Sequence, residues 1–178
     1  MADLSGKKVA VVAADYFEEA ELTEPVKALR EAGAEVEVIS DKKDKIQGLK
    51  HVDPGQKVKV DKNLDEANAE DYDALVLPGG AVNADNLRMN QKARDFVTKI
   101  MDEEGKPTAV ICHAPWILVS AGLARGKKLT SFFTIQDDMR NAGAEWVDEE
   151  VVIDDNLITS RNPDDLPAFN DALINALA

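Results

Sequence analysis

The one cysteine of the chain, Cys112, is followed directly by one of its two histidines, His113. A thiolate is a nucleophile and an imidazole can take up its proton, so the pair could carry covalent catalysis. Adjacent side chains usually diverge, however, and a free cysteine is also among the most often buried residues. A histidine at this place can simply cap a helix. The role of the pair therefore depends on the backbone that presents it.

The position of Cys112 favours the reactive alternative. A β-branched run at 107–112 ends at the cysteine, and an apolar helical pattern at 113–124 follows at once. A residue at such a strand-to-helix turn occupies a nucleophile elbow, which pushes its side chain outward. Backbone N–H groups at the start of the helix stabilise a thiolate, so we expect a lowered pKa for the Cys112 thiol. The same groups could form an oxyanion hole.

Three glutamates, Glu18, Glu19 and Glu21, stand before a predicted helix. Such residues usually just complement the helix dipole. A carboxyl beside a thiolate would have to keep its proton and donate a hydrogen bond, because two negative charges would repel each other. The spacing does not select which of the three would do this. The Pro-Gly-Gly segment at 78–80 is typical of a tight turn and lacks the further residues of a phosphate-binding loop.

The elements that must position these residues alternate between strands and helices. We predict strands at 7–14, 34–40, 57–61, 72–80 and 107–112, with a possible short strand at 129–132, a loop or edge region at 41–57 and a hairpin at 149–161 turning at Asp155-Asn156. We predict helices at 24–32, 86–104, 113–124, 135–143 and 163–178. This alternation indicates an α/β sandwich with a mostly parallel sheet. Sites in such sheets form beyond the carboxyl ends of the strands, so the loops after 7–14, 74–77 and 108–111 should meet if these strands are neighbours.

Length and composition exclude several classes of function. We expect 178 residues to form a single domain spanning 1–178. The net charge of −13 disfavours nucleic acid as a partner, because that affinity comes from Lys and Arg. No apolar run approaches the ~20 residues of a membrane span, and no secretory signal is present. One cysteine excludes an internal disulfide and, with two histidines, gives no metal-ligand set, so we expect a cytoplasmic protein without metal or cofactor.

The chain resembles the ThiJ/PfpI superfamily, especially the PfpI-type intracellular peptidases and general stress proteins. The matching segments cover nearly the whole chain in order: AADYFEEAEL (13–22), EDYDALVLPGG (70–80), AVICHAPWILVSAGLARGKKLTS (109–131), DDMRNAGAEWVDEEVVIDDN (137–156) and SRNPDDLPAF (160–169). The resemblance implies a flavodoxin-like three-layer sandwich related to class I glutamine amidotransferases. It also implies a nucleophile elbow at Cys112 with His113 beside it, and Glu18 as the glutamate that touches the cysteine. In PfpI-type oligomers an acidic residue of a neighbouring subunit completes a triad; allowing one inserted residue, Asp85 falls at that place, and a homodimer or larger assembly is implied.

The sequence departs from the family pattern at three of the expected site residues. Family members commonly have Cys-His-Gly-Pro, so Ala114 adds a methyl group beside the oxyanion site. Asp85 is shorter than the glutamate of the archetypal peptidase, and Trp116 replaces a smaller polar residue. With Gly79 and Gly80, we place Ala114 and Trp116 in the pocket or oxyanion site.

Three functions remain open. The first is a stress-response enzyme that removes reactive carbonyls as a glyoxalase or deglycase, with Cys112 attacking methylglyoxal or a glycated adduct. The second is an intracellular cysteine peptidase, which needs an extended cleft. The third is a peroxide sensor that acts through oxidation of Cys112. A tight pocket with Trp116 and Ala114 would favour small substrates, so carbonyl chemistry ranks first.

Overall fold

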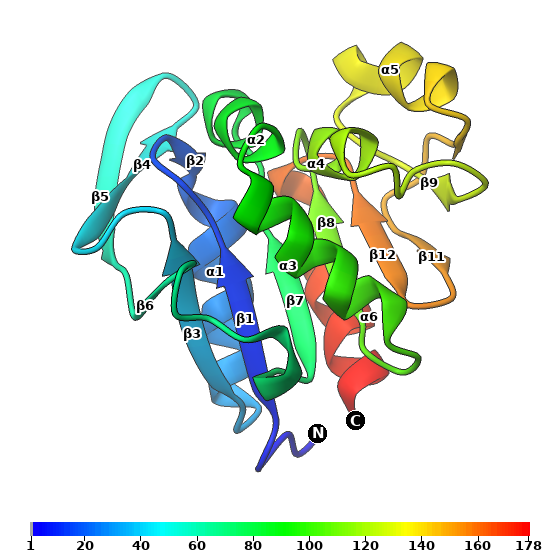
Figure 1. Cartoon of the computed structure of the whole chain (residues 1–178). Coiled ribbons are helices and arrows are strands. Elements are labelled where there is room, and N and C mark those ends of the chain that lie inside the picture. Colours follow the sequence, from blue (N-terminus) through cyan, green and yellow to red (C-terminus); the bar gives the residue numbers. More distant parts are fainter. Residues whose placement is uncertain (1) are drawn as a thin grey trace.

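The computed structural model describes residues 2–178, and a seven-stranded sheet runs through its centre (Figure 1). The strand order is β11-β12-β8-β7-β1-β3-β6, and only β11 runs antiparallel to its neighbour. The strands are β1 (Lys8–Val12), β3 (Glu35–Ser40), β6 (Lys62–Asn63), β7 (Ala74–Leu77), β8 (Thr108–Ile111), β11 (Val152–Asp154) and β12 (Leu157–Ser160). This arrangement confirms the flavodoxin-like sandwich with a mostly parallel sheet. The antiparallel pair β11 and β12 confirms the hairpin predicted at 149–161.

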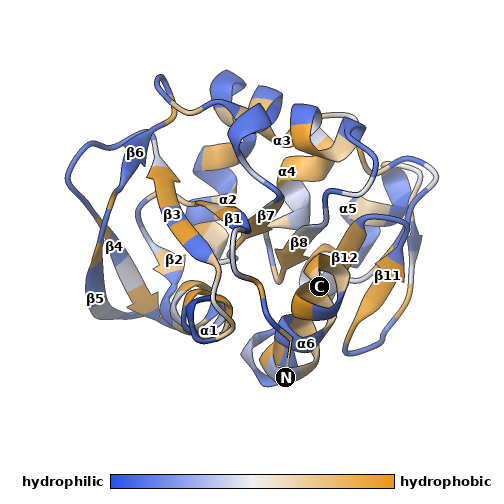
Figure 2. Ribbon diagram, turned by 90° about the horizontal axis from the view of Figure 1, so that it is seen from below, coloured by the Kyte–Doolittle hydropathy of each residue, from blue (hydrophilic) through white to orange (hydrophobic). Residues whose placement is uncertain are grey.

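Helices cover both faces of this sheet, as Figure 2 shows from below. They are α1 (Glu19–Glu31), α2 (Ala81–Arg88), α3 (Gln91–Asp102), α4 (Pro115–Ser120), α5 (Gln136–Asn141) and α6 (Leu166–Leu177), with short 3-10 turns η1 (Ala69–Asp71), η2 (Phe133–Ile135) and η3 (Pro163–Asp165). One face packs against α1 and α6, and the other packs against α3 and α4. Strands β1, β7 and β8 are therefore buried on both faces, which explains their unbroken apolar sequences. No helix within 2–178 is long and apolar enough to cross a membrane.

The three central strands end level with one another. Val11 of β1 is in register with Val76 of β7, and Leu77 of β7 is in register with Val110 of β8. The loops after these strands consequently leave the sheet side by side. The expectation that these three loops meet at the carboxyl ends of the strands is confirmed.

Three helices differ from prediction. The helix predicted at 113–124 spans only Pro115–Ser120 and ends before Gly122, which has a positive φ of 74°. Helix α1 begins at Glu19 rather than at 24, so Pro25 lies inside the helix. The helix predicted at 86–104 is two helices, because the side chain of Asn90 accepts a hydrogen bond from the Ala93 N–H and starts α3 afresh. Asp85 lies on α2.

The segment 41–57, expected to be a loop or edge region, contains most of a β-hairpin. Strands β4 (Lys45–Lys50) and β5 (Asp53–Lys59) pair antiparallel, and β2 (Phe17–Glu18) joins β4. The tip residue His51 has a positive φ of 59°. Lys, Asp, Gly and Pro are rare in strands, which is why the composition hid this hairpin. A further two-stranded sheet consists of β9 (Lys128–Leu129) and β10 (Glu145–Trp146).

Candidate active site

Cys112 stands between β8 and α4 with a φ of 65°. A side chain larger than glycine is strained in this left-handed region, so its surroundings must hold it there. The Cys112 N–H donates to the carbonyl oxygen of Ser160 at 3.0 Å, and the Cys112 carbonyl accepts the Phe132 N–H at 2.7 Å. The backbone turn expected of a nucleophile elbow is present.

His113 lies beside the sulfur in spite of its adjacent position in the chain. Its Nδ1 is 3.4 Å from Cys112 Sγ. The imidazole stacks on the ring of Phe132, with centroids 4.7 Å apart, and meets the ring of Trp116 edge-on. Burial lowers the pKa of His113, so the ring is neutral near pH 7 and can accept a proton. Within 2–178, its only side-chain hydrogen bond or ion pair is the one with Cys112.

Glu21, and not Glu18, is the carboxyl that contacts Cys112. Glu21 is fully buried, and its Oε1 accepts the Gly79 N–H at 3.0 Å. Its carboxyl lies close enough to the Cys112 thiol for each group to shift the pKa of the other, and its Oε2 has no hydrogen-bond partner within 2–178. Burial, and secondarily the charge of Glu18, raise the pKa of Glu21 to about 8. Glu21 is therefore protonated at neutral pH and able to donate a hydrogen bond.

The assignment of Glu18 to this contact was wrong. Glu18 precedes α1, and its carboxylate accepts the His51 N–H at 3.0 Å, which ties the β4–β5 hairpin to the rim of the site. Helical spacing could have identified Glu21. It stands four residues before Pro25 and eight before Leu29, on the face of α1 that is buried.

The expectation of a lowered thiol pKa was also wrong. Burial of Cys112, followed by the charge of an ionised Glu21, raises the pKa of the thiol. The N–H groups of Gly80 and His113 donate to the sulfur and act in the opposite direction. Protonation of Glu21 removes the second cause and adds a third donor, so the proton of Glu21 controls how readily the thiolate forms.

Gly79 and Gly80 bring the loop after β7 against the elbow. A Cβ on Gly79 would lie 2.7 Å from the Cys112 Cβ and would collide with the Glu21 carboxyl. Gly80 has a φ of 94°, and a Cβ there would lie 2.7 Å from the Tyr16 carbonyl oxygen. Gly79 requires glycine because its backbone approaches the reacting groups directly, and Gly80 requires it because of its positive φ and its close approach to the backbone of residues 16–18.

The pair faces a groove of about 1230 Å³. Its lining residues are Tyr16, Glu18, Glu19, Ala20, Glu21, Leu49, Lys50, His51, Val52, Gly80, Ala81, Val82, Cys112, His113, Phe132, Asn162, Pro163 and Asp164. The hairpin tip and Phe132 were not anticipated as parts of the site. Their places depend on contacts between distant segments.

The expected tight pocket with Ala114 and Trp116 is not found. Ala114 is fully buried in the core cluster on the other face of the sheet. Trp116 donates its indole N–H to Asp138 at 2.8 Å and supports the His113 ring instead of lining the groove. Asp85 is exposed on α2 and is likewise outside the lining.

Comparison with known proteins places this geometry in a family. The model of the DJ-1/PfpI family matches residues 7–176. The chain is 50% identical over 162 residues to "Deglycase TK1284" of Thermococcus kodakarensis, covering 91% of this chain and 94% of the relative. It is 46% identical over 166 residues to "General stress protein 18" of Bacillus subtilis, covering 93% of this chain and 94% of that relative.

A solved structure agrees with these relatives. A two-domain protein of Anabaena variabilis with DJ-1/ThiJ/PfpI-like and ferritin-like domains has a TM-score of 0.91 and 40% identity. The match covers 96% of this chain and 48% of that one. The chain belongs to the DJ-1/PfpI family.

The raised pKa of Glu21 predicts a pH-dependent loss of stability. The folded protein holds this proton until about pH 8, whereas the unfolded chain releases it near the ordinary value of 4.5. The stability that comes from this difference is fully present below the pKa of Glu21 in the unfolded chain. It is lost as the pH rises to the pKa of Glu21 in the folded protein. Glu21→Gln should abolish this loss. From about pH 5 to pH 8 the wild type should therefore lose roughly 1 kcal/mol per pH unit relative to the variant in urea unfolding.

Glu19→Gln is the matched control for this experiment, because Glu19 is two residues away, its carboxylate accepts the Gln56 N–H of the hairpin, and its charge is not among the causes that raise the pKa of Glu21. It should keep the pH slope of the wild type. An identical slope in wild type and Glu21→Gln would contradict a buried, protonated Glu21.

Proposed function

We propose that this protein is a stress-related, cysteine-dependent deglycase that removes reactive carbonyls from amines. The observation that carries the proposal is the contact of Cys112 with a protonated Glu21 on one side and a neutral His113 on the other. This arrangement activates a thiol without any cofactor. The names of the relatives, a deglycase and a stress protein, support the same class of function.

The first step replaces the amine by the cysteine. The Cys112 proton moves to His113 Nδ1 as Sγ attacks the carbon that joins a methylglyoxal adduct to its amine. A C–S bond forms, the C–N bond breaks, and the imidazolium returns the proton to the departing amine. Glu21 and the N–H groups of Gly80 and His113 stabilise the sulfur while it carries negative charge.

The second step releases the carbon skeleton. The hemithioacetal left on Cys112 bears a ketone on its neighbouring carbon. His113 moves a proton between these two carbons through an enediol, which converts the intermediate to a thioester of lactate. Water then hydrolyses the thioester to lactate and free thiol. The oxidation of one carbon is balanced by reduction of the other, so no external oxidant is needed.

The size of the groove bears on the substrate. Pockets of about 300–1,000 Å³ already enclose a drug-sized ligand, so a groove of about 1230 Å³ has room for an adduct carried on a larger molecule. A groove of this volume can also hold a peptide, so a peptidase is the second candidate. Peptide hydrolysis makes the greater demand on His113, which must protonate an amide leaving group and has no orienting carboxylate within 2–178.

We further propose that a second copy of the chain supplies this carboxylate. The first residues of α2, Ala81 and Val82, line the groove, and Asp85 is exposed one turn further along the same helix. In a two-fold assembly, Asp85 of each subunit would orient His113 of the other. The site would then be composed of two chains.

Both members of the pair should be required for turnover. Cys112→Ser should abolish release of lactate from a methylglyoxal-treated peptide, because a serine hydroxyl does not ionise near neutral pH. His113→Ala should lower the rate about 100-fold, the usual scale for loss of a general acid and base. Free methylglyoxal and an unmodified unfolded peptide, assayed in parallel, separate the deglycase from a glyoxalase and a peptidase. Cleavage of the unmodified peptide alone would replace the deglycase by the peptidase.

The shared site can be tested by mixing two impaired variants. Asp85→Ala and Cys112→Ser should each have low activity alone, while subunit exchange between them should restore activity. One site of the mixed dimer contains an intact Cys112, His113 and partner's Asp85. Sedimentation establishes the oligomeric state of each sample. A monomer with full activity, or an Asp85→Ala oligomer with full activity, would exclude the role of Asp85.

A further inference from the structure

The strained backbone of Cys112 is held by two backbone hydrogen bonds to segments distant in the sequence. Its N–H is bonded to Ser160 and its carbonyl to Phe132, at 3.0 and 2.7 Å. A left-handed conformation of a non-glycine residue persists only where its surroundings over-determine it. The two bonding residues must therefore themselves be fixed.

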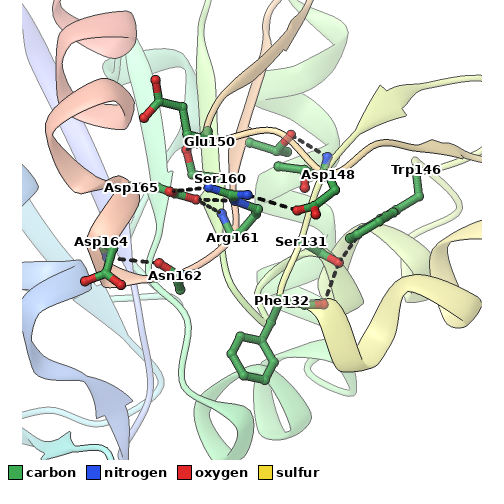
Figure 3. Close-up of polar contacts among 12 residues, drawn as sticks. Ser131, Phe132, Trp146, Asp148, Glu150, Ser160, Arg161, Asn162, Asp164 and Asp165 are labelled. Atoms are coloured by element: carbon green, nitrogen blue, oxygen red, sulfur yellow. Dashed lines mark hydrogen bonds and ion pairs between the residues drawn. The ribbon is translucent and has the colours of Figure 1, made fainter.

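Phe132 is fixed by a short chain of side-chain contacts that leads to Trp146, as Figure 3 shows. The Trp146 indole N–H donates to the Ser131 hydroxyl at 2.9 Å, and this hydroxyl donates to the Phe132 carbonyl at 2.9 Å. Ser131 is fully buried, so both bonds are shielded from water. Phe132 also stacks on His113. Trp146 thus acts on both members of the pair through one residue.

Ser160 is fixed by its own hydroxyl and by its neighbour Arg161. The Ser160 hydroxyl donates to the carbonyl of Glu150 at 2.6 Å. Arg161 makes a forked pair with the buried Asp165, with two contacts of 2.9 Å (Figure 3). Forked pairs of this kind are strong and directional. The third contact of Arg161, to Asp148, joins a side chain that is 70% exposed, where an ion pair contributes little.

We propose that Trp146 and Arg161 are positioning residues that together hold the elbow of Cys112 in its strained form and the ring of His113 against the sulfur. Neither residue lines the groove, so each acts through Phe132 or Ser160. Relaxation of the elbow would move Sγ away from the N–H groups of Gly80 and His113. This inference does not rest on the carbonyl chemistry, because it concerns the thiol itself.

Trp146→Phe is the first test, since it removes the indole N–H and keeps an aromatic ring. A single hydrogen bond of this kind corresponds to roughly a fivefold change in an equilibrium. We expect alkylation of Cys112 by iodoacetamide at neutral pH to slow by about that factor, with its pH midpoint shifted upward. Ser131→Ala cuts the same chain and should have the same effect, with no further loss in the double variant. Arg140→Gln is the control, because Arg140 packs over the Trp146 ring without touching the indole N–H.

The second test separates positioning from mere structural support. Glycine adopts a φ of 65° without strain, so Cys112→Gly removes the strain that the two residues restrain. When Cys112 is present, Trp146→Phe lets the elbow relax, and the released backbone strain offsets part of the free energy of unfolding that the substitution removes. The same substitution should therefore destabilise the Cys112→Gly protein more than the wild type in urea unfolding. Arg161→Lys, which loses the fork, should show coupling of the same sign, and Asp148→Asn should show none.

If Trp146→Phe lowers the free energy of unfolding equally in the wild type and in the Cys112→Gly protein, and leaves the alkylation rate of Cys112 unchanged, the role of Trp146 is overturned. The same pair of results for Arg161→Lys would overturn the role of Arg161. If Trp146→Phe fails to fold, Ser131→Ala gives the same two readouts.

Discussion

The contact between the Glu21 carboxyl and the Cys112 thiol is the interaction on which the rest of the site depends. Two buried groups this close cannot both carry a negative charge at an acceptable cost. Burial resolves the conflict by raising the pKa of Glu21 to about 8, which leaves this carboxyl as a proton donor at neutral pH. The glycines of the loop after β7, the neutral His113 and the strained elbow all place donors or a base around the one sulfur that can then become charged.

The fold supplies this contact through three neighbouring parallel strands that end at one level. The loop after β1 leads into α1 and brings Glu21, the loop after β7 brings the two glycines, and β8 brings Cys112. These three segments are far apart in the sequence. A hydrogen bond from the Cys112 N–H to Ser160 and one from the Phe132 N–H to the Cys112 carbonyl then fix the cysteine backbone, so the site is built at the carboxyl ends of the sheet's rigid central strands.

The sequence predicts what depends on local pattern. The elbow at Cys112 follows from an apolar strand that ends where a helical pattern begins, and the order of strands and helices gives the parallel sheet. The partner of the thiol was missed because the predicted helix at 24–32 begins five residues too late and leaves Glu21 outside the helical pattern that would have shown its inward face. The β4–β5 hairpin was missed because its stability comes from contacts with β2 and Glu18 instead of its own composition. The width of the groove depends on packing between distant segments, and no local pattern encodes it.

The protonation of Glu21 is tested most directly by carbon NMR of its carboxyl group in the folded protein, with Glu21→Gln used to assign the signal. We expect a carboxyl that titrates with a midpoint near pH 8 and is protonated at neutral pH. A midpoint near the ordinary value of 4.5 would place a carboxylate charge beside the sulfur at neutral pH and would contradict a protonated Glu21.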